Sequence, residues 1–239
     1  MKITSNIFLL SGSAFSAVGN SDAIGDVYGV VSDKGIILID CGKSKYGFET
    51  IKETLSSWGI KKRITHCILT HAHVDHCGNA KRFQDEGAII IVGKEDYDYC
   101  TKGGPENEIT PYYEEQCFSC FRPDIVIDKD EKLEINGVNF ELLKTPGHTR
   151  GSLSVRISSD EKYILFTGDI LQPDGMKLDS CNFGWKGDPY YNPNEIYKSI
   201  KKLSMYKTDV ILPGHGNICL KNGDVLLKHA LKKAYLLNR

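Results

Sequence analysis

The chain has 239 residues, 41% of them hydrophobic and 26% charged, and its 30 Lys and Arg balance 31 Asp and Glu to a formal net charge of −1. This length can bury the core of one globular domain. The lack of a basic excess argues against sequence-independent binding of nucleic acid. No uncharged apolar run reaches the roughly 18 to 20 residues that a membrane span needs. We therefore expect a protein that binds neither nucleic acid nor membrane.

The N-terminus resembles a secretory signal only superficially. Its apolar run at 7–10 is interrupted at Ser11, short of the about 7 to 15 residues of a signal core, so a β-strand is predicted there. The eight cysteines are scattered, and only Cys117 and Cys120 form a CxxC pair. A zinc ribbon needs a second pair at suitable spacing. We expect free thiols and a cytoplasmic location.

Short apolar runs rich in β-branched residues alternate with helical patterns, which is typical of a mixed α/β fold. Strands are predicted at 7–10, 27–31, 36–39, 64–69 and 89–92, and again at 125–127, 138–143, 153–157, 163–166 and 210–212. Apolar side chains recur on one face near 47–59, including Trp58, and also near 193–205 and 222–237, which predicts three helices. Asn192 and Pro193 are a typical helix start.

Two long stretches, 95–124 and 171–192, show no regular pattern and are rich in aromatic residues, glycine and proline. Long loops in a compact domain commonly cover or line a binding site. Helical turns packed on the core are the alternative for parts of them. Their aromatic side chains would suit an organic acyl group, and Arg150, Lys177 or Lys186 could meet a carboxylate or phosphate of a substrate.

Four potential metal ligands follow the predicted strand at 64–69 within six residues: His71, His73, Asp75 and His76. Two histidines that are two residues apart can point the same way from an extended backbone and bind one metal. Asp75 and His76 can turn toward a second metal.

Three further candidates, His148, Asp169 and His215, lie far downstream and each adjoins a glycine. Glycine turns at strand ends hold a ligand without steric obstruction. Five histidines and two aspartates suit two divalent metals bridged by a carboxylate and a water-derived oxygen. His66 and His229 lie outside these motifs and are predicted to be ordinary core or surface residues.

The motifs, in this order and over nearly the whole chain, closely resemble those of the metallo-β-lactamase superfamily. They are Asp-Cys-Gly at 40–42, HxHxDH at 71–76, Thr-Pro-Gly-His-Thr at 145–149, Phe-Thr-Gly-Asp at 166–169 and Pro-Gly-His at 213–215. The resemblance implies an αββα sandwich of the α/β class, formed by a single domain, 1–239, with pseudo-equivalent halves of about 1–122 and 123–239. Metals would lie at one edge of the sheets.

The same resemblance implies a ligand set. His71, His73 and His148 would bind the first metal, and Asp75, His76 and His215 the second. Asp169 would bridge the two metals, and Asp40 would orient a ligand through a hydrogen bond.

Departures from the family pattern favour one branch. Zinc β-lactamases that use a cysteine ligand place it where this chain has Asp169, whereas the Phe-Thr-Gly-Asp motif is similar to glyoxalase II, lactonase and phosphodiesterase enzymes. Di-iron flavoprotein oxygen reductases carry Glu at the position of His73. Full-length glyoxalase II enzymes add a helical glutathione-binding domain after the last histidine, but only 24 residues follow His215 here. The resemblance thus favours short glyoxalase II-like and lactonase-like hydrolases.

We therefore predict a metal-dependent hydrolase that cleaves a thioester, carboxylic ester or lactone of a small molecule with a hydroxide bridging two divalent metals. Zinc is expected first, with iron or manganese as alternatives. Asp75 and Asp169 are the catalytic candidates, and Asp75 could also shuttle a proton. Cys77 is expected to be a packed, idle thiol.

Three other functions stay open: an iron-dependent redox enzyme of the persulfide dioxygenase type, a phosphodiesterase and a non-catalytic metal-binding module. The sequence leaves the oligomeric state open.

Overall fold

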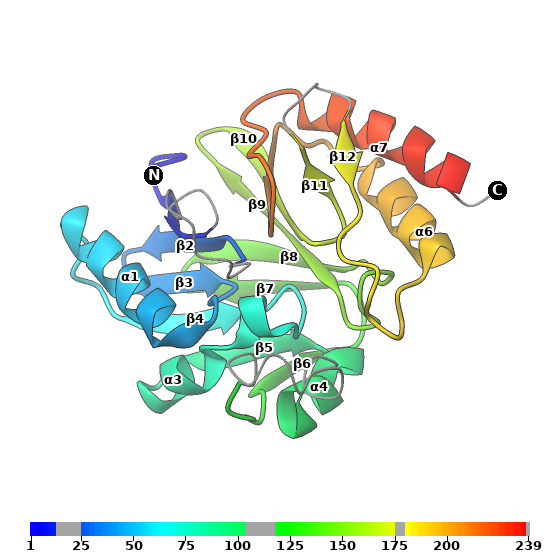
Figure 1. Ribbon diagram of the computed structural model, residues 1–239. Coiled ribbons are helices and arrows are strands. Elements are labelled where there is room, and N and C mark those ends of the chain that lie inside the picture. The colour runs from blue at the N-terminus through cyan, green and yellow to red at the C-terminus, as the bar shows by residue number, and fades with distance from the viewer. Residues whose placement is uncertain (13–24, 104–117, 175–179, 238–239) are drawn as a thin grey trace.

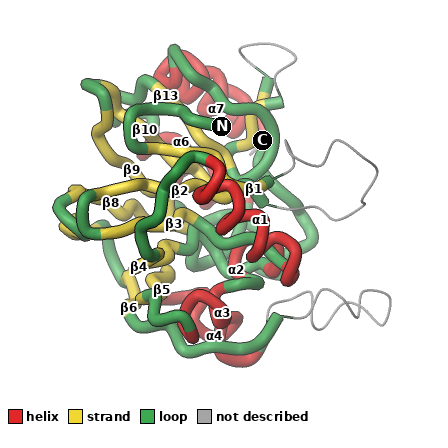
Figure 2. The backbone as a smooth tube through the Cα atoms, turned by 90° about the vertical axis from the view of Figure 1, so that its left-hand side faces the viewer, coloured by secondary structure: helices red, strands yellow, loops and turns green. Residues whose placement is uncertain are grey.

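The computed structural model describes residues 1–12, 25–103, 118–174 and 180–237. Two β-sheets face each other, and helices cover the outer face of each sheet (Figure 1). In the view turned by 90°, α6 and α7 lie at the opposite end of the molecule from α3 and α4 (Figure 2). These four layers confirm the predicted αββα sandwich.

The first sheet has six strands in the order β1-β2-β3-β4-β5-β6. Their bounds are β1 (Ile7–Ser11), β2 (Val27–Ser32), β3 (Gly35–Ile39), β4 (Ile64–Ile68), β5 (Ile89–Gly93) and β6 (Ile125–Ile127). The pairs from β3 onward are parallel. The connecting helices are α1 (Ser44–Ser57), α2 (Val74–Cys77), α3 (Ala80–Asp85), the 3₁₀ turn η2 (Lys94–Asp96) and α4 (Tyr97–Lys102). Strand β6 (Ile125–Ile127) belongs to the first sheet, although the expected boundary between the two halves is near residue 122.

The second sheet has five strands in the order β13-β10-β9-β8-β7. Their bounds are β7 (Glu131–Ile135), β8 (Val138–Lys144), β9 (Leu153–Ser159), β10 (Lys162–Gly168) and β13 (Val210–Pro213). Strand β13 pairs parallel with β10. Helices α6 (Pro193–Leu203) and α7 (Gly223–Leu237) cover this sheet, and two short strands, β11 (Gln172–Pro173) and β12 (Cys181–Asn182), pair with each other.

Alternation along the strands divides the core into layers. In β1, Phe8 and Leu10 pack with the helices α1 and α3, whereas Ile7 and Leu9 belong to the apolar layer between the two sheets, together with Phe166. Successive side chains of a strand point to opposite faces. A strand buried on both faces therefore reads as a continuous apolar run, which is why β1, β3 and β13 could be recognised in the sequence.

The three predicted helices are present as α1, α6 and α7, and the short helices α2, α3 and α4 are additional. The Asn192 side chain accepts hydrogen bonds from the backbone N–H groups of Asn194 and Glu195, and Pro193 opens α6, as predicted. Trp58, expected on the buried face of α1, instead follows the end of that helix and is 47% exposed. The stretch 95–124 contains α4, in line with the alternative of helical turns rather than with an irregular loop throughout.

The carboxyl ends of the parallel strands meet at one edge of the sandwich. The loops that follow β3, β4, β10 and β13 begin at this edge and carry Asp40, His71, Asp169 and His215. In open α/β sheets this is the side where ligands bind. The Leu153 N–H donates to the Thr70 carbonyl at 2.7 Å, so main-chain hydrogen bonding joins the two sheets there.

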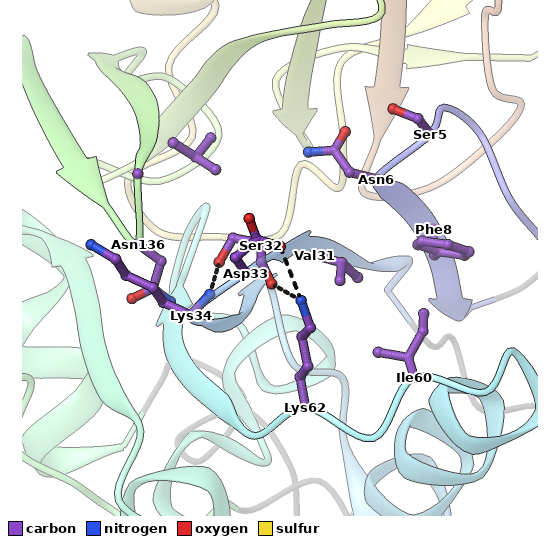
Figure 3. A pocket seen from close by; sticks show the side chains of 12 residues that line it. Ser5, Asn6, Phe8, Val31, Ser32, Asp33, Lys34, Ile60, Lys62 and Asn136 are labelled. Carbon is purple, nitrogen blue, oxygen red and sulfur yellow. Dashed lines mark hydrogen bonds and ion pairs between the residues drawn. The ribbon is translucent and has the colours of Figure 1, made fainter.

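A separate hollow of about 590 Å³ lies at the other end of the strands (Figure 3). Asp33 and Lys34, which precede β3, and Lys62, which precedes β4, line it. The Lys62 ammonium donates to the Ser32 carbonyl at 2.7 Å and lies 3.5 Å from Asp33. No predicted site residue is among those that line this hollow.

Candidate metal centre

The seven predicted ligands come together at the carboxyl edge. They form overlapping groups whose donor atoms lie within 4.8 Å of one another: His71, His73 and His148; His71, His76 and Asp169; and Asp75, His76 and His215. We call the first group the histidine cluster and the third the mixed cluster. Asp169 lies between them, with a carboxylate oxygen 3.7 Å from His148 Nε2 and 3.6 Å from His215 Nε2.

In the histidine cluster three imidazole nitrogens point at one place. His148 Nε2 lies 3.1 Å from His71 Nε2 and 3.0 Å from His73 Nδ1. All three side chains are buried. Burial lowers the pKa of His71 well below 6.5 and that of His148 to about 4. These two rings are therefore neutral at neutral pH, and each carries one N–H and one lone pair.

The outer hydrogen bonds show which nitrogens carry protons. The Thr70 hydroxyl donates to Asp40 at 2.7 Å, so its oxygen accepts from His71 Nδ1 at 3.1 Å. His73 Nε2 donates to the carboxylate of Asp188 at 2.9 Å. His71 Nε2 and His73 Nδ1 therefore each direct a lone pair into the cluster. If His148 Nε2 carries a proton, it can donate a hydrogen bond to only one of these two nitrogens. A divalent cation would accept all three lone pairs, so this group fits a metal.

The mixed cluster combines two histidines with a carboxylate. His76 Nε2 lies 3.2 Å from His215 Nε2, which lies 2.8 Å from a carboxylate oxygen of Asp75. Burial alone would lower the pKa of His76, but the carboxylates of Asp75, Asp169 and Asp40 outweigh it and raise this pKa well above 6.5. Without a metal, the neighbouring carboxylates stabilise the protonated imidazoles of His76 and His215. A divalent cation would take the place of those protons.

Asp169 gives an independent test of whether a metal fits. Its Oδ1 is buried and has no hydrogen-bond partner among the described residues. The positive charges of His215 and His76 nevertheless overcome burial and lower the pKa of this carboxyl, so it is ionised. His76 Nε2 lies 3.5 Å from Oδ1 without forming a hydrogen bond, and a metal cation would stabilise this buried charged oxygen directly. A β-carbon at Gly214 would come within 2.4 Å of this oxygen, so only glycine leaves the space open.

Asp40 connects the end of β3 with both halves of the HxHxDH motif. Its carboxylate accepts from the Thr70 N–H and hydroxyl, each at 2.7 Å, and from His76 Nδ1 at 2.8 Å. Its backbone φ of 58° lies in the left-handed region, which is unusual for a residue other than glycine. The contact with His76 agrees with the orienting role that the family resemblance implies for Asp40.

Asp188 is a functional candidate that the sequence analysis missed. Besides accepting from His73 Nε2, its carboxylate accepts from the Tyr99 hydroxyl at 3.2 Å and from the Tyr190 N–H at 2.6 Å. The contact with His73 lowers the pKa of Asp188 in spite of burial. The only sequence signal was its place in the aromatic stretch 171–192. This carboxylate orients a histidine of the first cluster, as Asp40 does in the second.

Asp96 is a second buried carboxylate without a sequence signal. It accepts from the Ala72 N–H at 3.0 Å, the Thr149 hydroxyl at 2.8 Å and the Gly151 N–H at 2.8 Å. Burial raises its pKa to about 6 in spite of these hydrogen bonds. It thereby ties the loop of His71 and His73 to the loop of His148.

Several aromatic residues of the two predicted loops lie beside the histidine cluster. The Trp185 and His73 rings are 5.7 Å apart, and the Tyr99 and Tyr190 rings are 6.4 Å apart. The Arg150 guanidinium stacks 3.7 Å above the Tyr190 ring.

The other residues considered in the sequence lie elsewhere. Lys186 is exposed, and Cys77 is buried in the apolar core under α1. His66 is half-buried in β4 and His229 is exposed on α7, and neither joins a cluster. Lys177 and Cys117 lie outside the described residues.

Sequence comparison identifies the family. The model of the metallo-beta-lactamase superfamily matches residues 22–215, and the chain belongs to this superfamily. Its members are metal-dependent hydrolases that typically bind zinc. Across the described residues, no helix has the length and apolar character needed to cross a membrane.

Individual relatives are distant. Hydroxyacylglutathione hydrolase GloC of Haemophilus influenzae is 30% identical over 154 residues, which cover 63% of this chain and 68% of that protein. An uncharacterized protein of Mycobacterium tuberculosis is 29% identical over 194 residues, covering 76% of this chain and 80% of the relative. The FEZ-1 metallo-β-lactamase of Legionella gormanii superposes with a TM-score of 0.73 at 20% identity, covering 99% of this chain and 94% of that one, which shows a shared fold.

Proposed function

We propose that this protein hydrolyses small-molecule thioesters, or carboxylic esters and lactones, with two divalent metals, zinc in the first place. The observation that carries the proposal is the convergence of seven donor residues into two adjoining clusters with the Asp169 carboxylate between them. The similarity to a hydroxyacylglutathione hydrolase, an enzyme named for a thioester substrate, supports the thioester as the first choice.

The residues divide the work between the two clusters. His71, His73 and His148 would hold one metal, Asp75, His76 and His215 the other, and Asp169 would contact both. When bound, such metals polarise a carbonyl group and lower the pKa of water toward neutrality. Imidazole ligands carry no negative charge, so the metal of the histidine cluster would keep its full positive charge and attract the oxygen of the scissile carbonyl.

Asp75 is the carboxylate best placed to move a proton. Its side chain is 17% exposed, whereas that of Asp169 is 5% exposed. In thioester hydrolysis water adds to the carbonyl carbon, the carbon–sulfur bond breaks, and the proton removed from water ends on the departing thiolate. Asp75 at the open side of the site can accept that proton and return it.

Initial rates on a panel of substrates test the proposal. The panel comprises S-lactoylglutathione, a simple acyl thioester, an acyl-homoserine lactone, bis-nitrophenyl phosphate and a chromogenic β-lactam. We expect turnover of a thioester or lactone that is lost in the chelator-stripped protein and restored by zinc. Turnover of the phosphodiester alone, or oxygen uptake with a persulfide by iron-loaded protein, would contradict it. Absence of turnover of every substrate in the panel, by protein that carries two zinc ions per chain, would also contradict the proposal.

A further inference from the structure

The strongest feature outside the proposed metal ligands is the pair formed by Arg150 and Tyr190. The guanidinium carbon of Arg150 lies 3.7 Å from the centroid of the Tyr190 ring, which is 42% exposed. A guanidinium stacked in this way keeps its N–H groups at the edge of the plane, where they can donate to another group. The stack therefore presents a preoriented cation at the surface.

The backbone of Arg150 is fixed on both sides. The Thr149 hydroxyl and the Gly151 N–H both donate to the buried carboxylate of Asp96. His148 is only two residues away, so the two α-carbons are no more than about 7.6 Å apart. Arg150 is thus anchored in the same short loop as a proposed ligand of the first metal.

Tyr190 is tied to the same cluster from the other direction. Its N–H donates to Asp188 at 2.6 Å, and Asp188 accepts from His73 Nε2 at 2.9 Å. Trp185 contacts the His73 ring, and Tyr99 contacts the Tyr190 ring and donates from its hydroxyl to Asp188. These three aromatic side chains, which we call the aromatic strip, link the surroundings of His73 with those of the guanidinium.

A second stacked arginine shows what sets Arg150 apart. Arg156 also lies over a tyrosine, Tyr163 at 4.0 Å, but it is nearly buried and pairs with Glu141 at 2.8 Å. Arg150 is exposed and forms no ion pair with any carboxylate in the part of the chain that the structure describes. Its guanidinium lies in the loop of His148 and has no ion-pair partner among the described residues, so an anion of the substrate can take the place of a counter-ion.

We infer that Arg150 and Tyr190 form a carboxylate-binding subsite, and that the acyl part of the substrate is a dicarboxylic acid whose free carboxylate meets Arg150. The inference rests on the proposed hydrolysis for the position of the scissile bond. The apolar carbons of the acyl chain lie along Trp185 and Tyr99, and the carboxylate accepts two N–H groups of the planar guanidinium.

A matched pair of thioesters tests the subsite in the zinc-loaded full chain. S-adipoyl-N-acetylcysteamine carries the carboxylate, and S-(6-methylheptanoyl)-N-acetylcysteamine replaces it with an isopropyl group of similar shape. Arg150→Met should lower kcat/KM for the adipoyl thioester about tenfold and leave the neutral thioester within about twofold. Arg122→Met, an exposed arginine before β6 at the other end of the strands, is the matched control and should change neither.

Equal losses on both thioesters, or no loss on either, would overturn the inference. A binding measurement decides it even if neither thioester is hydrolysed, an outcome that would count against the proposed function alone. By calorimetry, wild-type protein should bind adipate more tightly than 6-methylheptanoate, and Arg150→Met should remove that preference. Adipate bound equally well by wild-type and variant, or not bound at all, would refute the subsite.

Discussion

The two clusters share one edge of the sandwich but have opposite electrostatics. Burial dominates the histidine cluster, where the pKa of His148 falls to about 4 and that of His71 falls well below 6.5. Carboxylates dominate the mixed cluster, where they raise the pKa values of His76 and His215. Converging imidazole lone pairs thus characterise the histidine cluster, whereas ion pairs between histidines and carboxylates characterise the mixed cluster.

The difference extends to the residues that support each cluster. His73 of the histidine cluster donates to Asp188, which also accepts from a tyrosine of the aromatic strip. His76 of the mixed cluster donates to Asp40, which also fixes the Thr70 backbone at the end of β4. Asp188, which supports the histidine cluster, contacts the aromatic residues of the proposed substrate site, whereas Asp40, which supports the mixed cluster, contacts the end of a strand. Asp40 contacts His76 directly and His71 only through the Thr70 hydroxyl, so its substitution should act chiefly on the mixed cluster, whereas substitution of Asp188 should act on the histidine cluster.

The largest effect is expected from Asp169→Ala, which removes the carboxylate shared by both clusters. Zinc content should fall below two per chain, and kcat should fall by more than the roughly 100-fold that loss of a supporting hydrogen bond costs. Metal analysis together with the substrate panel measures both quantities. Asp98→Ala, an exposed aspartate of α4, is the control. Two tightly held zinc ions and wild-type turnover in Asp169→Ala would remove Asp169 from the site.

The next effect compares the two supporting carboxylates. Asp40→Asn keeps the shape, and asparagine tolerates the left-handed φ of 58° better than most residues. Its amide cannot accept from Thr70 and His76 as the carboxylate does, so zinc affinity of the mixed cluster should fall about 10- to 100-fold. Competition with a chromogenic chelator, fitted to two sites, measures the change.

Asp188→Asn is the counterpart on the histidine cluster and should weaken the other zinc site. We expect about a tenfold loss, at the lower end of that range, because Asp188 holds only the outer nitrogen of His73. If both variants weaken the same site, or both sites equally, the two clusters are not separate units.

Asp96→Asn should act on stability first. The amide would turn an NH₂ group toward main-chain and hydroxyl donors, at a cost of about 1 to 3 kcal/mol. The pKa of Asp96 is raised from 3.8 to about 6 in the folded protein. Between these values the folded state binds more protons than the unfolded state, so the contribution of this group to stability falls as pH rises. The cost of Asp96→Asn should thus be smaller at about pH 7.5 than at about pH 5.

Urea unfolding of metal-free protein at the two pH values measures this cost. Asp124→Asn is a suitable control, because Asp124 accepts from the Ile90 N–H at the amino end of β5, where no proposed ligand lies. A cost that is the same at both pH values, or larger at the higher one, would contradict the titration of Asp96.

The strands and the seven candidate ligands could be proposed from the sequence because local patterns mark them, and the family resemblance supplied the αββα arrangement. Strands buried on two faces appear as apolar runs, and ligands next to glycines or within HxHxDH are adjacent in sequence. Strand β7 was missed because three of its five residues, Glu131, Lys132 and Glu134, are charged and exposed. The short helices α3 and α4 were missed because six residues are too few to show a helical period.

The supporting residues could not be predicted, because their role arises from tertiary contacts. Asp188 lies 115 residues from His73 in sequence, and Asp96 contacts loops from both sheets. An aspartate in an irregular loop has no distinguishing spacing, and only the fold brings it to a histidine. The stack of Arg150 on Tyr190 is of the same kind.

The smallest effect is expected from Tyr99→Phe. The Tyr99 hydroxyl donates to Asp188 at 3.2 Å, a long hydrogen bond onto a carboxylate that His73 and the Tyr190 N–H also contact. Its loss should cost less than about 1 kcal/mol and lower zinc affinity of the histidine cluster no more than about threefold. Tyr197→Phe, which removes a hydroxyl from a half-buried tyrosine packed on Tyr235, is the matched control. A loss in the mixed cluster instead would show that Asp188 couples the two sites, since the Tyr99 hydroxyl donates to Asp188, which supports the histidine cluster.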